Sequence, residues 1–207
     1  MLNIKNFFQQ SWLLIVSSFF FGLLIAGANA AWKDKIDYNV NVYKFNKIAK
    51  EVLPEAANFE DVSNQIEVET EKGGKMPVTL KKAVDSSGAV IGWLFTCQGP
   101  GFADQIQLIM AVDADFEHIK GFGVLASNET PNFGDKIKTP YYRNQFVGAP
   151  AATLSLVKTG DPEKIDSDIV AISGATISSQ AVVNIVNQFL PQVKEKMKTE
   201  GLIGNGK

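Results

Sequence analysis

The segment from Ser11 to Ala31 contains no charged residue, and most of its side chains are apolar. An α-helix over this range would rise about 30 Å, which matches the hydrocarbon thickness of a membrane. Trp12 and Trp32 stand at its two ends, where amphipathic rings favour the membrane interface. We therefore expect a transmembrane anchor over residues 11–31, preceded by a tail over residues 1–10.

A cleaved secretory signal is the alternative for the same segment, because Ala28-Asn29-Ala30 fits a small-x-small cleavage site. Two features favour a retained anchor: the apolar run is longer than an ordinary signal core, and the residues after it continue as a plausible helix. Basic residues stand on both sides of the run, with Lys5 before it and Lys33 and Lys35 after it. The positive-inside rule therefore does not orient the segment.

The chain of 207 residues is long enough to bury one modest core, and its 45% hydrophobic and 20% charged residues are ordinary for a globular protein. A net charge of −2 without a basic stripe predicts that it does not bind nucleic acid. Cys97 is the one cysteine, which excludes an internal disulfide, an iron–sulfur site and a zinc site. His118 is the one histidine, and its neighbours are typical of a turn, where a solvated imidazole is expected.

Hydrophobic periodicity predicts a helix over residues 40–53, ended by Pro54, within a helical connector over residues 32–57. Its apolar face would carry five side chains: Val42, Phe45, Ile48, Ala49 and Val52. Later apolar runs bounded by turn residues predict strands over five ranges: 77–84, 89–95, 106–112, 119–125 and 154–157. The third and fourth of these should form a hairpin around Asp113-Ala114-Asp115.

Two further features complete the expected domain. Gln98-Gly99-Pro100-Gly101 is expected to break the chain, and a short helix is expected over residues 141–146. A long helix is expected over residues 179–198, where Pro191 should produce a kink or break near Leu190. A central run of strands with helices at either end indicates the α+β class. The expected architecture is one transmembrane helix, a single domain of antiparallel strands and flanking helices over residues 58–200, and a tail over residues 201–207.

A small-residue turn stands before this last helix, in Asp168-Ile-Val-Ala-Ile-Ser173-Gly174-Ala175-Thr176-Ile-Ser178-Ser179. It would place the Thr176 hydroxyl at a helix N-terminus, where unpaired N–H groups and the helix dipole favour an anion such as phosphate. An ordinary helix cap, with Thr or Ser as N-cap and glycine in a tight turn, explains the same residues.

A second pattern lies upstream, in Asn128-Glu129-Thr130-Pro131-Asn132-Phe133-Gly134-Asp135-Lys136-Ile137. Together the two patterns resemble the FMN-binding domain family, which has a Ser-Gly-Ala-Thr motif followed by a Ser/Thr pair, and a Glu-Thr-Pro-Gly-Leu-Gly loop. Asn132 and Phe133 depart from that loop, but Asn tolerates left-handed backbone angles and Phe keeps an apolar group for a flavin ring. The resemblance also takes in the apolar N-terminal segment, residues 53–56, the central strands and the last helix.

The resemblance implies FMN joined through its phosphate to Thr176, by a flavin transferase that takes FMN from FAD. It implies that further residues line the cofactor site: Ser173, Gly174, Ala175, Ser178, Ser179, Glu129, Thr130 and Phe133. Tyr141 and Tyr142 are candidates for packing on the flavin ring, and Lys136 and Lys138 for contact with phosphate, beside ordinary roles in the core or in solvent. Asp168 belongs to the extended motif and is expected to be structural or to contact the transferase.

The family's best-known members are RnfG of the Rnf electron-transport complex and NqrC of the sodium-pumping NADH:quinone oxidoreductase. The resemblance therefore implies an electron-transfer component of an ion-translocating complex, and the shortness of the chain favours the RnfG type. The implied partners are the other membrane subunits, the transferase and membrane lipid. The implied location is the bacterial inner membrane, crossed once, with the FMN domain on the extracytoplasmic side.

Two alternatives remain at this point. One is a secreted or peripheral FMN-domain protein that serves another redox partner. The other is a flavin-binding sensory or scaffold domain that passes no electrons. No general acid–base constellation stands out in the sequence, so independent catalysis by this chain alone is not expected.

Overall fold

The computed structural model describes residues 4–37, 42–62, 66–70 and 73–204. Contacts divide the chain into two units, Met1–Lys44 and Phe45–Lys207. The first unit contains helix α1 (Ile4–Asp37), in which Ser11–Lys33 has a mean hydropathy of 2.0 and is long and apolar enough to cross a membrane. Large apolar side chains such as Phe19 (73% exposed) and Ile25 (70%) lie outside any protein core. The expected apolar N-terminal helix is thus confirmed, with longer bounds than predicted.

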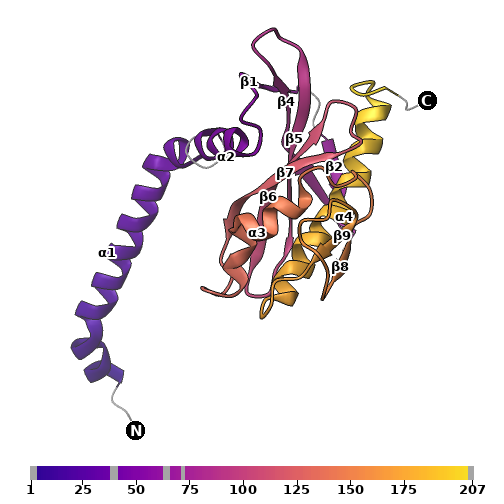
Figure 1. Ribbon diagram of the computed structural model, residues 1–207. Coiled ribbons are helices and arrows are strands. Elements are labelled where there is room, and N and C mark those ends of the chain that lie inside the picture. Colours follow the sequence, from indigo (N-terminus) through magenta and orange to yellow (C-terminus); the bar gives the residue numbers. More distant parts are fainter. Residues whose placement is uncertain (1–3, 38–41, 63–65, 71–72, 205–207) are drawn as a thin grey trace. The chain divides into compact units, whose positions relative to one another are not determined.

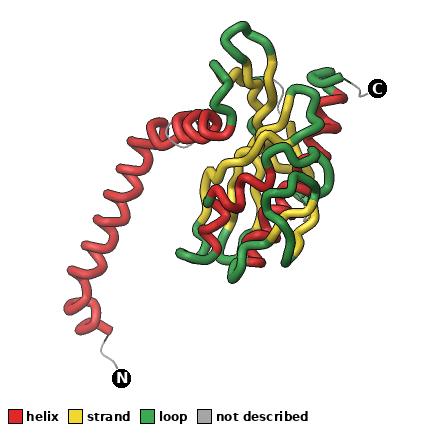
Figure 2. Tube along the Cα trace, in the orientation of Figure 1, coloured by secondary structure: helices red, strands yellow, loops and turns green. Residues whose placement is uncertain are grey.

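The second unit is built around one antiparallel sheet of five strands (Figures 1 and 2). Its order is β1-β4-β5-β6-β7. The strands have these bounds: β1 (Asn58–Asp61), β4 (Leu80–Val84), β5 (Val90–Pro100), β6 (Gln105–Asp113) and β7 (Ile119–Ser127). The expected hairpin is confirmed, since β6 pairs with β7 in antiparallel register from Ile106 opposite Ser127 to Val112 opposite Ile119.

The expected break at residues 98–101 is wrong, because β5 continues to Pro100. Gln98, Gly99 and Pro100 pair with Gln107, Ile106 and Gln105 of β6. Gly99 has a packing role instead: a Cβ placed there would lie 2.7 Å from Ile185 Cγ1 on the last helix. A glycine inside a strand often marks such a close approach.

The single strand expected over residues 77–84 is divided between two sheets. β3 (Lys75–Val78) pairs with β2 (Ile66–Glu69), whereas β4 pairs with β1 and β5. Thr79 separates β3 from β4, and its N–H donates to Thr96 Oγ1 at 3.0 Å. Alternation in the sequence does not reveal this change of partner.

Helices cover both faces of the five-stranded sheet. Trp93, Phe95 and Cys97 alternate with Leu94 along β5, so the two sets point to opposite faces. The first set packs with α4 (Thr176–Thr199), through side chains such as Val186 and Phe189. Leu94 instead packs with the buried residues of α2 (Lys44–Val52), Phe45 and Ala49.

The connector helix differs from its prediction at its N-terminal end. Phe45 and Ala49 are buried as expected, but Val42 is 37% exposed, and Val40 lies outside the described residues. α2 approaches the sheet closely, since a Cβ placed on Gly123 of β7 would lie 2.1 Å from Ile48 Cγ2.

Helix α4 begins at Thr176, earlier than predicted, and continues through Pro191 without a break. Side chains on both sides of the proline, Leu190 and Val193, are buried in the core. This packing stabilises the helical conformation at Pro191, although proline alone disfavours the interior of a helix. Of the kink or break expected near Leu190, the break is therefore wrong.

Short elements join the sheet to α4. The predicted helix over residues 141–146 is present as α3 (Pro140–Arg143) followed by the 3₁₀ turn η3 (Asn144–Phe146), after a 3₁₀ turn η2 (Gly134–Lys138). β8 (Ser155–Val157) was predicted, but its parallel partner β9 (Asp168–Val170) was not. β9 leads directly into the turn before α4, so it fixes the start of the site segment.

Candidate functional site

The turn before α4 is held by its own hydrogen bonds. Gly174 has φ +79°, a left-handed conformation that favours glycine. The Ser179 hydroxyl accepts the N–H of Ile172 at 3.1 Å and donates to the carbonyl oxygen of Ala175 at 3.0 Å. Within the described chain, the N-cap Ala175 makes no side-chain capping bond. The turn therefore does not contain an ordinary helix cap with Thr or Ser at the N-cap position.

Thr176 is the first residue of α4, and its side chain is exposed. The first N–H groups of a helix have no acceptor within the helix, and the dipole places partial positive charge there. Ile177 beside it is 60% exposed. The hydroxyl of Thr176 thus stands in solvent at an electropositive helix end, as the sequence predicted.

The upstream loop lies against this turn. Asn132 has φ +64°, the left-handed conformation expected where the family pattern has glycine. The N–H groups of Phe133 and Asp135 both donate to the Thr130 carbonyl oxygen at 3.2 Å. Phe133 Cδ1 lies 3.5 Å from where a Cβ on Gly174 would stand, so its ring lies beside the glycine of the turn.

The two motifs form one groove of about 410 Å³. It is lined by residues from three segments: Phe102, Thr130, Phe133, Gly134, Gly174, Ala175, Thr176, Ile177 and Ser178. Phe102 (60% exposed) and Phe133 (54% exposed) are unusually open for phenylalanine side chains. The groove combines apolar surface with the helix start that carries Thr176.

Three groove residues were not predicted as site residues: Phe102, Gly134 and Ile177. Gly134 belongs to the second motif and Ile177 to the first, whereas Phe102 lies in neither. Phe102 follows Pro100-Gly101, where the pattern predicts a chain break rather than a strand end that opens into the site. Ile177 stands between the predicted Thr176 and Ser178, but the predicted helix began only at residue 179, so no exposed apolar side chain was expected at this position.

Other predicted residues lie outside the groove. Ser173 is exposed beside it, and Ser179 is buried under the turn. Glu129 is 5% exposed and also buried, where its carboxylate accepts from the Ser178 hydroxyl. Asp168 lies on β9 with its side chain exposed.

The two tyrosine candidates have opposite environments. Tyr141 is 54% exposed, whereas Tyr142 is fully buried and its hydroxyl donates to the Ser179 carbonyl oxygen at 2.8 Å. Burial raises the pKa of the Tyr142 phenol. Tyr142 therefore supports the turn from below instead of facing the groove.

The two lysine candidates remain near the loop. Lys136 Nζ lies 6.0 Å from the centre of the Phe133 ring. Lys138 Nζ is 3.5 Å from the Ser127 carbonyl oxygen. Neither belongs to the groove lining.

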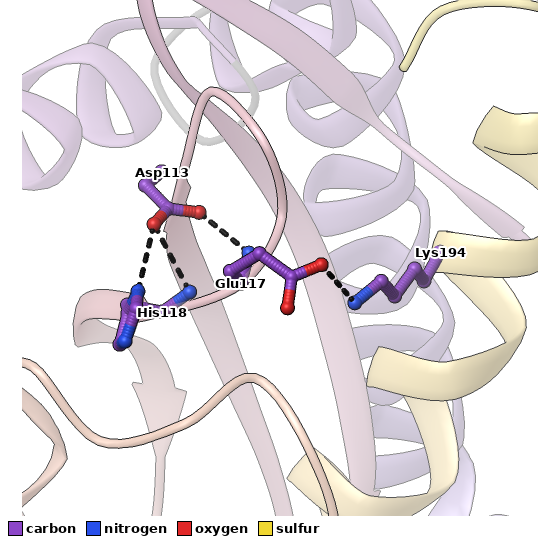
Figure 3. Close-up of polar contacts among 4 residues, drawn as sticks. All are labelled: Asp113, Glu117, His118 and Lys194. Carbon is purple, nitrogen blue, oxygen red and sulfur yellow. Dashed lines mark hydrogen bonds and ion pairs between the residues drawn. The ribbon is translucent and has the colours of Figure 1, made fainter. Parts of the chain in front are cut away.

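Titratable groups away from the groove have structural contacts. The Asp113 carboxylate accepts the N–H groups of Glu117 and His118 at 2.7 and 3.1 Å and lies 3.1 Å from His118 Nδ1, while Glu117 pairs with Lys194 at 3.0 Å (Figure 3). His118 closes the β6–β7 turn with its side chain exposed, as expected.

Burial raises the pKa of the Cys97 thiol. Across the described ranges, no group of three or more His, Cys, Asp or Glu could hold a metal ion.

Known proteins with similar sequences support a cofactor-binding domain at this groove. The sequence profile of the FMN-binding domain family matches residues 101–191, a range that holds all three segments of the groove. A relative, the G subunit of the ion-translocating oxidoreductase complex of Methanosarcina acetivorans, is 42% identical over 144 residues, covering 70% of this chain and 72% of the relative. The chain belongs to the FMN-binding domain family.

Two further similarities extend beyond the profile match. The G subunit of the Na(+)-translocating ferredoxin:NAD(+) oxidoreductase complex of Acetobacterium woodii is 32% identical over 192 residues, covering 90% of this chain and 91% of the relative. The crystal structure of NqrC from Shewanella oneidensis superposes with a TM-score of 0.54 at 25% identity, covering 69% of this chain and 73% of that chain. The α+β fold of this chain is thus the fold of NqrC.

Proposed function

We propose that this protein is a membrane-anchored electron-transfer component of an ion-translocating oxidoreductase complex, of the RnfG type. The observation that carries the proposal is the groove in which the two family motifs meet around the exposed Thr176. The similarity to the G subunits of two such complexes over most of the chain supports the same assignment.

The groove residues fit FMN chemically. Gly174 is exposed and has no side chain, so it leaves the backbone open just before α4, where a phosphate is favoured. Phe102, Phe133 and Ile177 offer exposed apolar surface to an aromatic ring. FMN, when bound, supplies electron transfer at its isoalloxazine ring. The chain's own residues would hold the phosphate, restrain the ring and exclude water from its packed face.

We propose that the cofactor is covalent, with Thr176 Oγ1 joined to the FMN phosphorus. In this attachment the hydroxyl oxygen displaces AMP from FAD: the new P–O ester forms, the pyrophosphate bond breaks, and the hydroxyl proton is lost. A threonine hydroxyl is a weak nucleophile by itself, so a flavin transferase must activate it. The site contributes an exposed side chain at a helix end that tolerates the added negative charge.

The attachment is tested by producing the full chain with a flavin transferase and viewing flavin fluorescence in a denaturing gel. Wild-type protein should fluoresce and Thr176→Ala should not. Thr153→Ala is the matched control, because Thr153 is also an exposed threonine and lies outside both the motif and the groove. Fluorescence that persists in Thr176→Ala would place the attachment elsewhere.

The relay role is tested in the assembled complex. Complex isolated with the Thr176→Ala chain should contain its other subunits but lose ferredoxin- or NADH-linked electron transfer, since no metal-binding cluster exists in the described chain to replace a flavin. Near-normal transfer in a flavin-free, fully assembled complex would make the domain a scaffold or sensor.

We further propose that α1 stays attached as a single-pass anchor, with the FMN domain on the extracytoplasmic side and the other membrane subunits and lipid around the span. The exposed apolar surface of Ser11–Lys33 supports this reading. The native protein should remain with membranes in a carbonate wash and keep its original N-terminus. A mature N-terminus at Ala31 would identify a secreted protein instead.

A further inference from the structure

Glu129 stands in the family motif but is turned away from the groove and buried, with 5% of its surface exposed. Its two carboxylate oxygens have different partners. Oε1 accepts the backbone N–H of Ala103 at 3.0 Å, and Oε2 accepts the hydroxyl of Ser178. These donors come from the β5–β6 loop and from the first turn of α4. One side chain therefore joins three segments that lie far apart in the sequence.

Two glycines make room for this carboxylate. A Cβ placed on Gly101 would lie 2.4 Å from Glu129 Oε1, and one placed on Gly134 would lie 2.8 Å from Oε2 and 2.6 Å from Ser178 Oγ. Real Cβ atoms do not approach other atoms so closely. The carboxylate thus occupies a fitted socket between the two loops and the helix.

A second tie holds the same β5–β6 loop. Asn128 Nδ2 donates to Asp104 Oδ2 at 2.8 Å, and the N–H of Gly101 donates to the Asp104 carbonyl oxygen at 2.8 Å. Phe102 lies in the middle of this loop and stands exposed at the groove. Its position relative to Thr176 therefore depends on bonds made by Glu129 and Asn128, not on core packing of its own ring.

We propose that Glu129 is a positioning residue, which braces the Phe102 loop against the first turn of α4 so that Phe102 forms a fixed wall for the flavin ring. The inference rests on the proposed function, because it assigns the wall to the ring of an FMN carried by Thr176. Glu129 acts through Phe102 and Ser178 and makes no contact with the ring itself.

The brace can be tested without flavin by hydrogen exchange at the Ala103 amide in the full chain in detergent. The amide should be protected in the wild type, lose protection in Glu129→Ala, and keep it in Glu129→Gln. The glutamine oxygen can accept from Ala103, and its NH₂ group can donate to Ser178 Oγ. Equal exchange in the wild type and in Glu129→Ala would overturn the proposal.

The effect on the ring is tested on flavin-loaded protein by fluorescence anisotropy and iodide quenching. In Glu129→Ala the anisotropy should fall and the quenching constant should rise about twofold, because the ring face that Phe102 covers becomes open to iodide. Phe102→Ala should give the same change, and since its side chain is exposed this variant leaves the socket and the fold intact.

A double-mutant cycle separates positioning from general destabilisation. Adding Glu129→Ala to Phe102→Ala should produce no further change in anisotropy, because the wall is already absent. Additive changes would mean that Glu129 acts on the ring by another route, and the proposal would fail. If wild-type chains made with the transferase carry no covalent flavin, the proposed function fails. Hydrogen exchange at the Ala103 amide does not need flavin and would still show whether Glu129 holds the β5–β6 loop.

Discussion

The close seating of α2 on the sheet predicts that Gly123→Ala destabilises the domain although the substitution adds only one methyl group. The new Cβ would lie 2.1 Å from Ile48 Cγ2 and 3.2 Å from Val52 Cγ2. Favourable carbon contacts lie at about 3.5–4.0 Å, so roughly 1.4 Å or more of separation must be gained at Ile48. Gly123 does not have a positive φ, so the effect is steric and not one of backbone strain.

The cost follows from what can move. Isoleucine in a helix has one strongly preferred χ1 rotamer, and turning χ1 by about 30° away from it costs about 0.5–1.5 kcal/mol. If the side chain stays, α2 must shift and loosen the contacts of Phe45 and Ala49 with the sheet. Overpacking of this kind typically costs about 1–3 kcal/mol. For a domain of this size, a loss of about 2 kcal/mol lowers Tm by about 4–8 °C.

The assay is thermal unfolding of the full chain in detergent, with Gly204→Ala as the control because a Cβ there meets nothing within 4 Å. The decisive comparison is with Ile48→Ala, which removes the clashing Cγ2. In that background Gly123→Ala should cost less than about 0.5 kcal/mol, which leaves a coupling of about 1–2 kcal/mol between the two sites. An equal loss in both backgrounds, or no loss in either, would refute the seating argument.

Two further predictions concern charged groups. Lys81 is 6% exposed and pairs at 2.7 Å with the exposed Asp61. In urea titrations, Lys81→Met should be neutral or stabilising, whereas Asp61→Ala should cost about 1–3 kcal/mol because it leaves a buried ammonium without its carboxylate. A larger loss in Lys81→Met than in Asp61→Ala would contradict this. The Asn128 amide, followed by the N–H of Gln105, holds the pKa of the Asp104 carboxyl below its ordinary value. Asn128→Ala should raise that pKa in an NMR titration and destabilise the protein at neutral pH, with the difference vanishing as the pH falls below the folded pKa, because a lowered pKa stabilises only the ionised form.

Much of the architecture could be predicted from local pattern. The apolar anchor segment, the β6–β7 hairpin and the long last helix have strong periodicity, and both motifs were placed on loops that do meet. The errors came from long-range partners. The break expected at residues 98–101 ignored pairing with β6, and the break expected at Pro191 ignored core packing on both sides of the proline. A parallel strand as short as β9 carries almost no periodic signal.

The sequence predicted which two motifs meet at the groove but not which of their side chains face it. Thr176, Thr130 and Phe133 line the groove, whereas Glu129 lies beneath it. Family motifs identify residues that matter without separating those that face a cofactor from those that hold the others in place. For Glu129, that distinction comes from its burial and from its hydrogen bonds with Ala103 and Ser178.

The bonds beneath the turn before α4 also determine when Thr176 has its final surroundings. The Ser179 hydroxyl links Ile172 to Ala175, and the Tyr142 hydroxyl binds the Ser179 carbonyl oxygen. The Ser179 contacts are local, but the Tyr142 bond joins residues 37 apart in the sequence and exists only in the folded domain. The Thr176 side chain stays exposed in that folded domain. The transferase that we propose would therefore meet a folded turn and not an unstructured tetrapeptide. Under the proposed attachment at Thr176, we expect folding to come before modification, and short peptides with the sequence Ser-Gly-Ala-Thr should be poor substrates.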